Sequence, residues 1–112
     1  ISVSTSLSDG TPLSMLEAMA CGLPLVMTEI PSYYEWVIDG KNGFLTSLDS
    51  PRLMAEALAK LLENKKLREK MGELNRSIAV SRAEITDNYK RLEQCYSFVS
   101  GKEDKIDLQN LL

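Results

Sequence analysis

The sequence predicts an α/β domain in which a parallel sheet of about three strands is flanked by helices, and three observations lead to this prediction. A strand, a helix and a second strand follow one another within residues 1–28, which is the pattern of a βαβ unit with a right-handed crossover. The second strand, residues 23–28, is a short apolar run without alternation, typical of a strand that is covered on both faces. Amphipathic helix patterns then follow from residue 51 onward, and a chain of 112 residues is long enough for one such domain.

The first helix has a recognisable signal at each end. Residues 1–6 form the first strand, and the turn-forming residues 7–10 follow it. Thr11 is suited to cap a helix, and Pro12 is suited to its first position. We therefore expect a helix over residues 12–21, ended by Gly22 in the left-handed conformation.

The middle of the chain predicts a short helix, a third strand and a longer helix. The short helix begins at Ser32 or Tyr33, the cluster of residues 39–43 forces a turn, and residues 44–46 form the strand. Ser50 followed by Pro51 repeats the start signal of a helix. The apolar stripe of this helix consists of Leu53, Met54, Ala57, Leu58, Leu61 and Leu62.

Two more helices complete the predicted domain, over residues 66–77 and 84–99. The apolar residues of the last helix are spaced to pack on one side, and they are Ile85, Tyr89, Leu92, Tyr96 and Val99. The pattern weakens after Gly101, so we expect residues 1–100 to form the domain and residues 101–112 to form a tail. Because the chain starts without Met inside a strand, we expect it to be a fragment whose missing strands precede residue 1.

Composition excludes several classes of function. A net charge of −3 argues against a nucleic-acid partner, because such sites need clustered Lys and Arg. The absence of histidine removes every Ser-His or Cys-His pair, and two distant cysteines cannot make a zinc site, so we expect no metal. No apolar run is long enough for a membrane span and no signal peptide is seen, which favours a cytoplasmic protein, with peripheral contact at the inner face of the membrane as an option.

Residues 8–24 carry the strongest functional signal. Asp9 lies in the loop after the first strand, and Glu17 lies eight positions later on the helix that follows. Ligands of open α/β sheets bind at the carboxyl ends of strands, where helix N-termini present free N–H groups to anions. Helical side chains lean toward the N-terminus, so the Glu17 carboxylate can reach the same ligand as Asp9. Paired carboxylates suit a ligand with adjacent hydroxyl groups.

These residues resemble the E-x7-E segment of retaining GT-B glycosyltransferases of group 1, written S-x-x-E-G-x-P-x-x-x-x-E-A-M-A-x-G-x-P. Residues 28–35, 39–45 and 61–72 are similar to further segments of that family in the same order, and the likeness covers most of residues 3–99. The resemblance implies that the domain is the C-terminal, nucleotide-sugar-binding part of a GT-B enzyme, with a partial Rossmann-like sheet.

The resemblance also implies roles for the loop residues. Asp9, with Gly10 and Thr11, would contact the hydroxyls of the transferred sugar. Glu35 matches a second acidic position of the family and is a secondary candidate, although an acid near a helix start is also favoured by the helix dipole. Asp9 replaces the usual Glu of the family, which shortens the arm by one methylene.

On the helix, the resemblance implies contacts to the nucleotide. Glu17 would hold the ribose hydroxyls, and the backbone N–H groups of Leu13 and Ser14 would face the diphosphate or the sugar. The family's phosphate-binding Arg and Lys lie upstream of this motif, and no Lys or Arg of the sequence matches them. No catalytic set is therefore complete in these residues, and we expect the chain alone to be inactive.

The implied reaction moves a sugar from a nucleoside-diphosphate sugar to a glycan, lipid or small-molecule acceptor with retention of configuration. No cofactor or metal is expected, and the implied partner is a missing N-terminal acceptor lobe of the same protein. The alternative is a non-catalytic α/β module that binds a phosphate or a partner, and a truncated sheet edge could also pair with a second copy.

Single residues also have structural interpretations. Asp9 could be a turn residue that bonds its own backbone. Tyr33, Tyr34 and Trp36 could stack on a base or a sugar, although core packing is the more frequent role of such aromatic residues.

Overall fold

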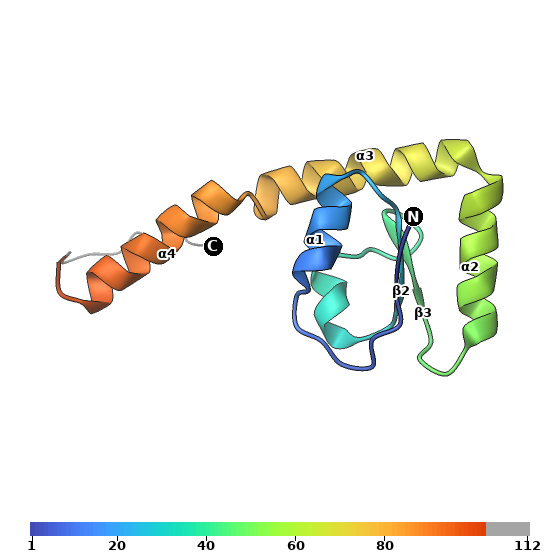
Figure 1. The fold of residues 1–112 in the computed structure, drawn as a ribbon, viewed down its shortest axis with the longest axis horizontal. Coiled ribbons are helices and arrows are strands. Elements are labelled where there is room, and N and C mark those ends of the chain that lie inside the picture. The colour runs from blue at the N-terminus through green and yellow to red at the C-terminus, as the bar shows by residue number, and fades with distance from the viewer. Residues whose placement is uncertain (103–112) are drawn as a thin grey trace. The chain divides into compact units, whose positions relative to one another are not determined.

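The computed structural model describes residues 1–102 and contains a parallel sheet of three strands in the order β1-β2-β3 (Figure 1). The strands are β1 (Ser2–Ser4), β2 (Leu25–Thr28) and β3 (Gly43–Thr46). Val26 at the centre of the sheet pairs with Val3 on one side and with Phe44 on the other. All four residues of β2 are buried, as its continuous apolar pattern predicted. The predicted α/β class, with about three parallel strands flanked by helices, is confirmed.

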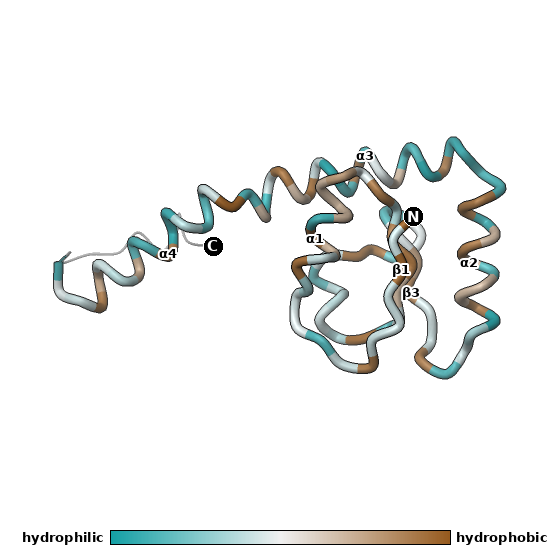
Figure 2. The backbone as a smooth tube through the Cα atoms, in the orientation of Figure 1, coloured by the Kyte–Doolittle hydropathy of each residue, from teal (hydrophilic) through white to brown (hydrophobic). Residues whose placement is uncertain are grey.

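The helices are α1 (Leu13–Ala20), the 3₁₀ helix η1 (Pro31–Glu35), α2 (Pro51–Glu63), α3 (Lys65–Arg82) and α4 (Ile85–Val99). In Figure 1, α1 and α2 lie on opposite sides of the strands, and α3 crosses from α2 to α1. Figure 2 shows hydrophobic residues along the strands and alternating polar and apolar residues along α2 and α3. The alternation matches helices that bury one face. No described helix is both long and apolar enough to span a membrane.

The described residues form two compact units, of which the first is residues 1–82 and the second begins at residue 83. The strands and α1, η1, α2 and α3 belong to the first unit. The second unit contains α4, whose start is capped by the Glu84 side chain, an acceptor for the N–H of Asp87 at 2.8 Å. Of the predicted tail, residues 101–112, only Gly101 and Lys102 are described.

The apolar residues of α4 do not pack as their spacing predicted. Five apolar residues of the helix were predicted to pack on one side, and all five are exposed: Ile85, Tyr89, Leu92, Tyr96 and Val99. Their helical spacing is present, but periodicity identifies a face without identifying what covers it.

The core of the first unit lies on both sides of β2. On the α2 side, Val26, Leu61 and Met71 form a buried cluster with Ala57. The predicted stripe of α2 is correct at Met54, Ala57, Leu58 and Leu61, which belong to this cluster or pack against it. It is wrong at its two flanks, because Leu53 is 40% exposed and Leu62 is 67% exposed. A stripe six residues wide exceeds the face that one helix can bury against a small sheet.

A close contact between two glycines joins α1 to α3. Gly22 ends α1 with φ of 70°, so the predicted left-handed cap is confirmed. A Cβ on Gly72 would lie 2.1 Å from the carbonyl oxygen of Gly22, a distance that no side chain tolerates. Arg76 donates to the Ala20 carbonyl at 2.6 Å and satisfies an otherwise free group at the end of α1.

Two asparagines, Asn42 and Asn75, form a buried hydrogen-bonded pair between α3 and the loops of the first unit. The Asn42 side chain donates to Trp36 O at 2.9 Å and to Asn75 Oδ1 at 2.8 Å, and it accepts from the N–H of Ile38 at 2.7 Å. The Asn75 amide donates to the carbonyls of Leu23 and Asn42, each at 2.8 Å. Both side chains are fully buried and fully satisfied, so they fix the position of α3.

The third helix extends further than predicted, to Arg82 in place of residue 77. Asn64 starts it, because its side chain accepts from the N–H of Leu67 at 2.9 Å. The last turns are stabilised by tertiary packing of buried residues such as Ala79. Local helix propensity does not predict such packing.

Candidate functional site

The candidate site is built on the segments that follow the carboxyl ends of β1 and β2. Residues 5–12 connect β1 to α1, and residues 29–36 contain η1. Because β1 and β2 are parallel neighbours, these segments emerge at the same edge of the sheet. A hydrogen bond of 3.2 Å from Trp36 Nε1 to Thr11 Oγ1 joins them. The carboxyl edge therefore carries the predicted loop together with η1.

The start of α1 differs from the prediction, in which Thr11 is the cap and Pro12 the first helical residue. Pro12 is itself the N-cap, with φ of −74° and ψ of 131°, and no side chain caps the helix. The Thr11 hydroxyl accepts a hydrogen bond from the indole N–H of Trp36 and does not cap the helix. The Pro12 carbonyl accepts from the N–H groups of Met15 and Leu16. The N–H groups of Leu13 and Ser14 precede the first residue that can bond within the helix, so they are free at its N-terminal end.

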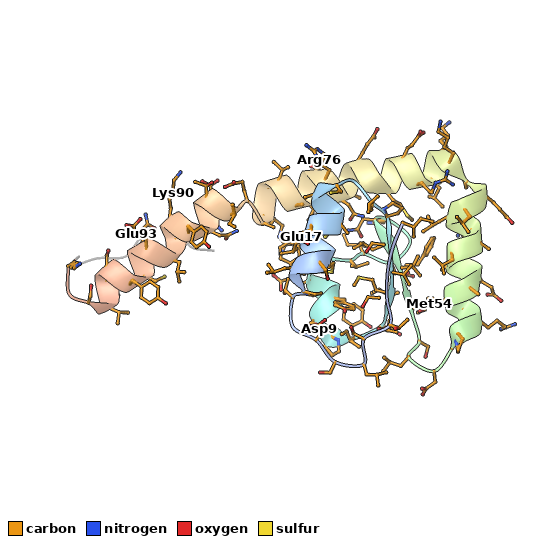
Figure 3. The ribbon with its side chains drawn as sticks, in the orientation of Figure 1. Asp9, Glu17, Met54, Arg76, Lys90 and Glu93 are labelled. Carbon is orange, nitrogen blue, oxygen red and sulfur yellow. The ribbon has the colours of Figure 1, made fainter. Side chains whose placement is uncertain are left out.

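Asp9 and Glu17 are both exposed, and neither carboxylate is sealed inside the protein. Figure 3 shows Asp9 in the loop that leads to α1 and Glu17 on α1 itself. Leu13 and Glu17 are four residues apart and share one face of the helix, and both are exposed while Met15 and Met19 are buried. Side chains of a helix lean toward its N-terminus, so we expect the Glu17 carboxylate to be directed toward the uncapped end.

The Asp9 side chain also takes part in its own turn. Its Oδ1 accepts from the N–H of Gly10 at 2.8 Å, which is the local bond expected of an aspartate in a turn. A carboxylate has a second oxygen and further lone pairs for a ligand. A Cβ added at Gly10 would meet no described atom within 4 Å, so this part of the loop faces open space.

Glu35 lies at the end of η1 and is paired with Arg82 at the end of α3. Arg82 Nη2 lies 3.2 Å from Glu35 Oε1, and Nη1 donates to the Glu35 carbonyl at 2.9 Å. Both side chains are about half exposed. The structure thus gives Glu35 a structural partner, and the same carboxylate remains accessible.

The three aromatic residues of this segment differ in exposure. Tyr33 is fully buried and Trp36 is 8% exposed, so these two act as core residues, the more frequent role for aromatic residues in such a segment. Tyr34 is exposed, and its hydroxyl donates to Glu29 Oε1 at 2.6 Å. This hydrogen bond, with a smaller effect of desolvation and of the negative charge of Glu29, raises the pKa of Tyr34.

Sequence reasoning missed the contribution of Arg82 to this region. Its guanidinium carbon lies 4.4 Å from the centroid of the Trp36 ring, in addition to its two contacts with Glu35. The two partners are 46 and 47 positions away in sequence, so no local pattern could have joined them. The predicted helix also ended at residue 77, so no sequence signal placed Arg82 in its last turn.

The fold and the site define a class of protein: an α/β domain with an exposed loop and helix start at the carboxyl edge of a parallel sheet, which is the edge where open α/β sheets bind their ligands. Residues 1–78 match the sequence model of the family described as Glycosyl transferases group 1. The chain belongs to this family.

Similar proteins agree with that assignment. A protein named uncharacterized glycosyltransferase MJ1178, from Methanocaldococcus jannaschii, is 37% identical over 68 residues, which are 61% of this chain and 19% of that protein. The crystal structure of TarM matches with a TM-score of 0.68 at 31% identity, over 73% of this chain and 17% of TarM. Sucrose-phosphate synthase from Thermosynechococcus elongatus matches with a TM-score of 0.84 over 90% of this chain and 25% of that chain, and at 21% identity it shows the fold alone. The chain thus spans about a fifth of the length of the curated relative.

Proposed function

We propose that this chain is the nucleotide-sugar-binding part of a retaining glycosyltransferase. The observation that carries the proposal is an uncapped helix start, with one exposed carboxylate in the preceding loop and a second on the same helix, in a chain of the group 1 family. Retention of configuration is inferred from the likeness of residues 8–24 to the segment of retaining enzymes.

In the proposed complex, the start of α1 binds the diphosphate. The N–H groups of Leu13 and Ser14 donate to it, and the positive end of the helix dipole favours its charge. The negative charge of the diphosphate grows as the bond to the sugar breaks, so these fixed donors stabilise the leaving group more in the transition state than in the ground state.

The two carboxylates hold the two ends of the donor. Glu17 accepts hydrogen bonds from the adjacent ribose hydroxyls, and Asp9, with Gly10 and Thr11, contacts hydroxyls of the transferred sugar. Glu35 is a secondary contact that would share its carboxylate between the donor and Arg82. Carboxylate acceptors make stronger bonds than neutral ones, which favours polyhydroxylated ligands at this site.

The proposed donor is a nucleoside-diphosphate sugar, and the proposed site needs no metal or cofactor. The relatives are several times longer than this chain, which supports a longer natural protein whose further residues supply the acceptor lobe and, upstream of the motif, the cations that neutralise the diphosphate. We therefore propose that transfer requires the full natural protein and that these residues alone do not catalyse it.

The test is calorimetric titration of the full natural protein with UDP-sugars and GDP-sugars, followed by NMR of the product to read its anomeric configuration. Replacing Glu17 by Gln removes charge-assisted bonds, and we expect donor binding to weaken about 10-fold. Glu56→Gln is the matched control, because Glu56 is an exposed glutamate on α2 in an ion pair with Arg52. An inverted product would refute retention.

A second candidate is a non-catalytic α/β module that binds phosphate or a partner. It is favoured by the existing local bonds of the two acids, Asp9 to Gly10 and Glu35 to Arg82, which give each a structural role. This candidate predicts that inorganic phosphate binds as well as any nucleotide sugar, and that Glu17→Gln does not weaken binding. The absence of heat with every nucleotide sugar would favour it over sugar transfer.

A further inference from the structure

Trp36 is the only tryptophan in the sequence, and it lies between the candidate donor loop and the end of α3. The residue is only 8% exposed, so it offers little surface for a ligand to stack on. Its indole N–H donates to Thr11 Oγ1 at 3.2 Å, and the guanidinium of Arg82 lies 4.4 Å from its ring centroid. The two contacts occupy different parts of the same ring system, so the ring links the loop to α3.

Arg82 is specialised for this position. Nη1 donates to the Glu35 carbonyl, Nη2 donates to the Glu35 carboxylate, and the guanidinium carbon lies over the ring of the next residue, Trp36. Arginine combines a fork of donors with a delocalised cation that stacks on aromatic rings, and lysine cannot reproduce that combination. Arg82 also lies beyond residues 1–78, the part of the chain that matches the family.

Thr11 is the point at which this link reaches the candidate site. It lies between Gly10 and the N-cap Pro12, and α1 has no side-chain cap to hold its start. Within the described residues, the Thr11 side chain makes one hydrogen bond, the one that it accepts from Trp36. The direction of the N–H groups of Leu13 and Ser14 depends on where Pro12 sits, and so on Thr11.

We propose that Arg82 and Trp36 are positioning residues for the donor loop: Arg82 holds the indole, and the indole fixes Thr11 and the start of α1. This inference rests on the proposed function, because its effect on the ligand exists only if the loop and α1 bind a nucleotide sugar. Neither residue touches the donor in this arrangement. Both act by holding groups that do, which lowers the cost of ordering the loop when the donor binds.

The experiment labels the full natural protein with fluorotryptophan and records fluorine NMR, with Trp36→Phe to assign the resonance of Trp36. Donor binding is measured by calorimetry and stability by urea denaturation. The variants are Arg82→Met, Arg82→Lys, Thr11→Val and Thr11→Ser. The matched control is Arg68→Met.

Arg68 resembles Arg82 in its helix and in its bonds to backbone carbonyls, but it does not contact the indole. It lies on the same helix, 14 residues earlier and therefore about 21 Å away along the axis. It also bonds backbone carbonyls, those of Leu61 and Leu62 at the end of α2. Arg68→Met should lower stability and leave both the Trp36 resonance and donor affinity unchanged.

We expect Arg82→Met to shift the Trp36 resonance and to weaken donor binding about 10-fold, since it removes a cation–π contact and two hydrogen bonds. Thr11→Val should also shift the resonance, because it removes the acceptor of the indole N–H. Arg82→Lys should fall between Arg82→Met and the natural protein. Thr11→Ser should restore the natural Trp36 resonance, because it keeps the hydroxyl that accepts from the indole.

Two results overturn the inference. If Arg82→Met lowers stability as Arg68→Met does but leaves the donor affinity unchanged, Arg82 is only structural. If the Trp36 resonance does not respond to Arg82→Met or Thr11→Val, the link does not exist. Failure of the proposed function is distinct from both, because then the unmodified protein binds no nucleotide sugar while the resonance still reports on the two contacts.

Discussion

Replacing Gly72 by alanine would place a methyl group where α1 and α3 touch. The new Cβ would lie 2.1 Å from the carbonyl oxygen of Gly22, whereas ordinary contacts are 3.4 Å or longer. The obstacle is backbone, so no side chain can rotate out of the way. The two helices must separate locally by roughly 1 Å to relieve the overlap, and packed interiors resist such shifts.

The expected cost follows from what that separation disturbs. Overpacking of a well-packed contact costs about 1–3 kcal/mol. The hydrogen bond from Asn75 to Leu23, which spans the same contact, would lengthen and contribute about 1 kcal/mol more. Alanine returns about 1 kcal/mol through its higher helix propensity. We expect Gly72→Ala to reduce the free energy of unfolding by about 1–3 kcal/mol.

The assay is urea denaturation of the protein, with two variants for comparison. Gly22→Ala should cost only about 1–2 kcal/mol, because its Cβ would meet Gly72 at an ordinary 3.5 Å and the cost is that of the left-handed backbone. Ser77→Ala, an exposed change on α3, should be neutral or slightly stabilising. A loss below about 1 kcal/mol for Gly72→Ala would refute the reasoning, since the helices would then have room for a methyl group.

Two further changes test other features. Asn75→Ala leaves buried groups of Asn42 and Leu23 without partners, and we expect a loss of about 2–4 kcal/mol by urea denaturation, so a loss under about 1 kcal/mol would contradict the buried network. Glu29→Gln should lower the raised pKa of Tyr34 toward 10.0, read as tyrosinate absorbance during alkaline titration against the unmodified protein. The pKa of Tyr34 is higher in the folded chain than in the unfolded chain. The contact therefore stabilises the fold below pH about 10, and this contribution is lost as the pH rises through the folded pKa. An unchanged titration in Glu29→Gln would contradict the contact.

Local signals predicted the boundaries of several elements because the physical causes are themselves local. Gly22 ends α1 through its backbone freedom, and Ser50 starts α2 by accepting from the N–H of Leu53. The same kind of signal failed at Thr11, where a hydroxyl suited to a helix cap accepts from Trp36 instead. A cap residue has a choice of partners, and only the folded chain shows which one is nearer.

The candidate site was predictable only in part for the same reason. The sequence places Asp9 and Glu17 on a loop and the adjoining helix, and the structure leaves both exposed. Sequence spacing does not bring Arg82 to Trp36, because that contact depends on α3 crossing to the side of the sheet on which α1 lies. How far α3 extends is set by buried residues such as Ala79 and not by a stop signal.

The buried pair of Asn42 and Asn75 sets a condition for building chimeras from related domains. A transplanted α3 with an aliphatic residue at position 75 would leave the carbonyl of Leu23 and one N–H of the Asn42 amide without a hydrogen-bond partner. Exchanging both asparagines for apolar residues does not solve the problem, because Ile38 and Leu23 offer main-chain groups that no substitution removes. Helix α3 is therefore transferable only together with the loops that its asparagine meets, at Leu23 and at residues 36–42.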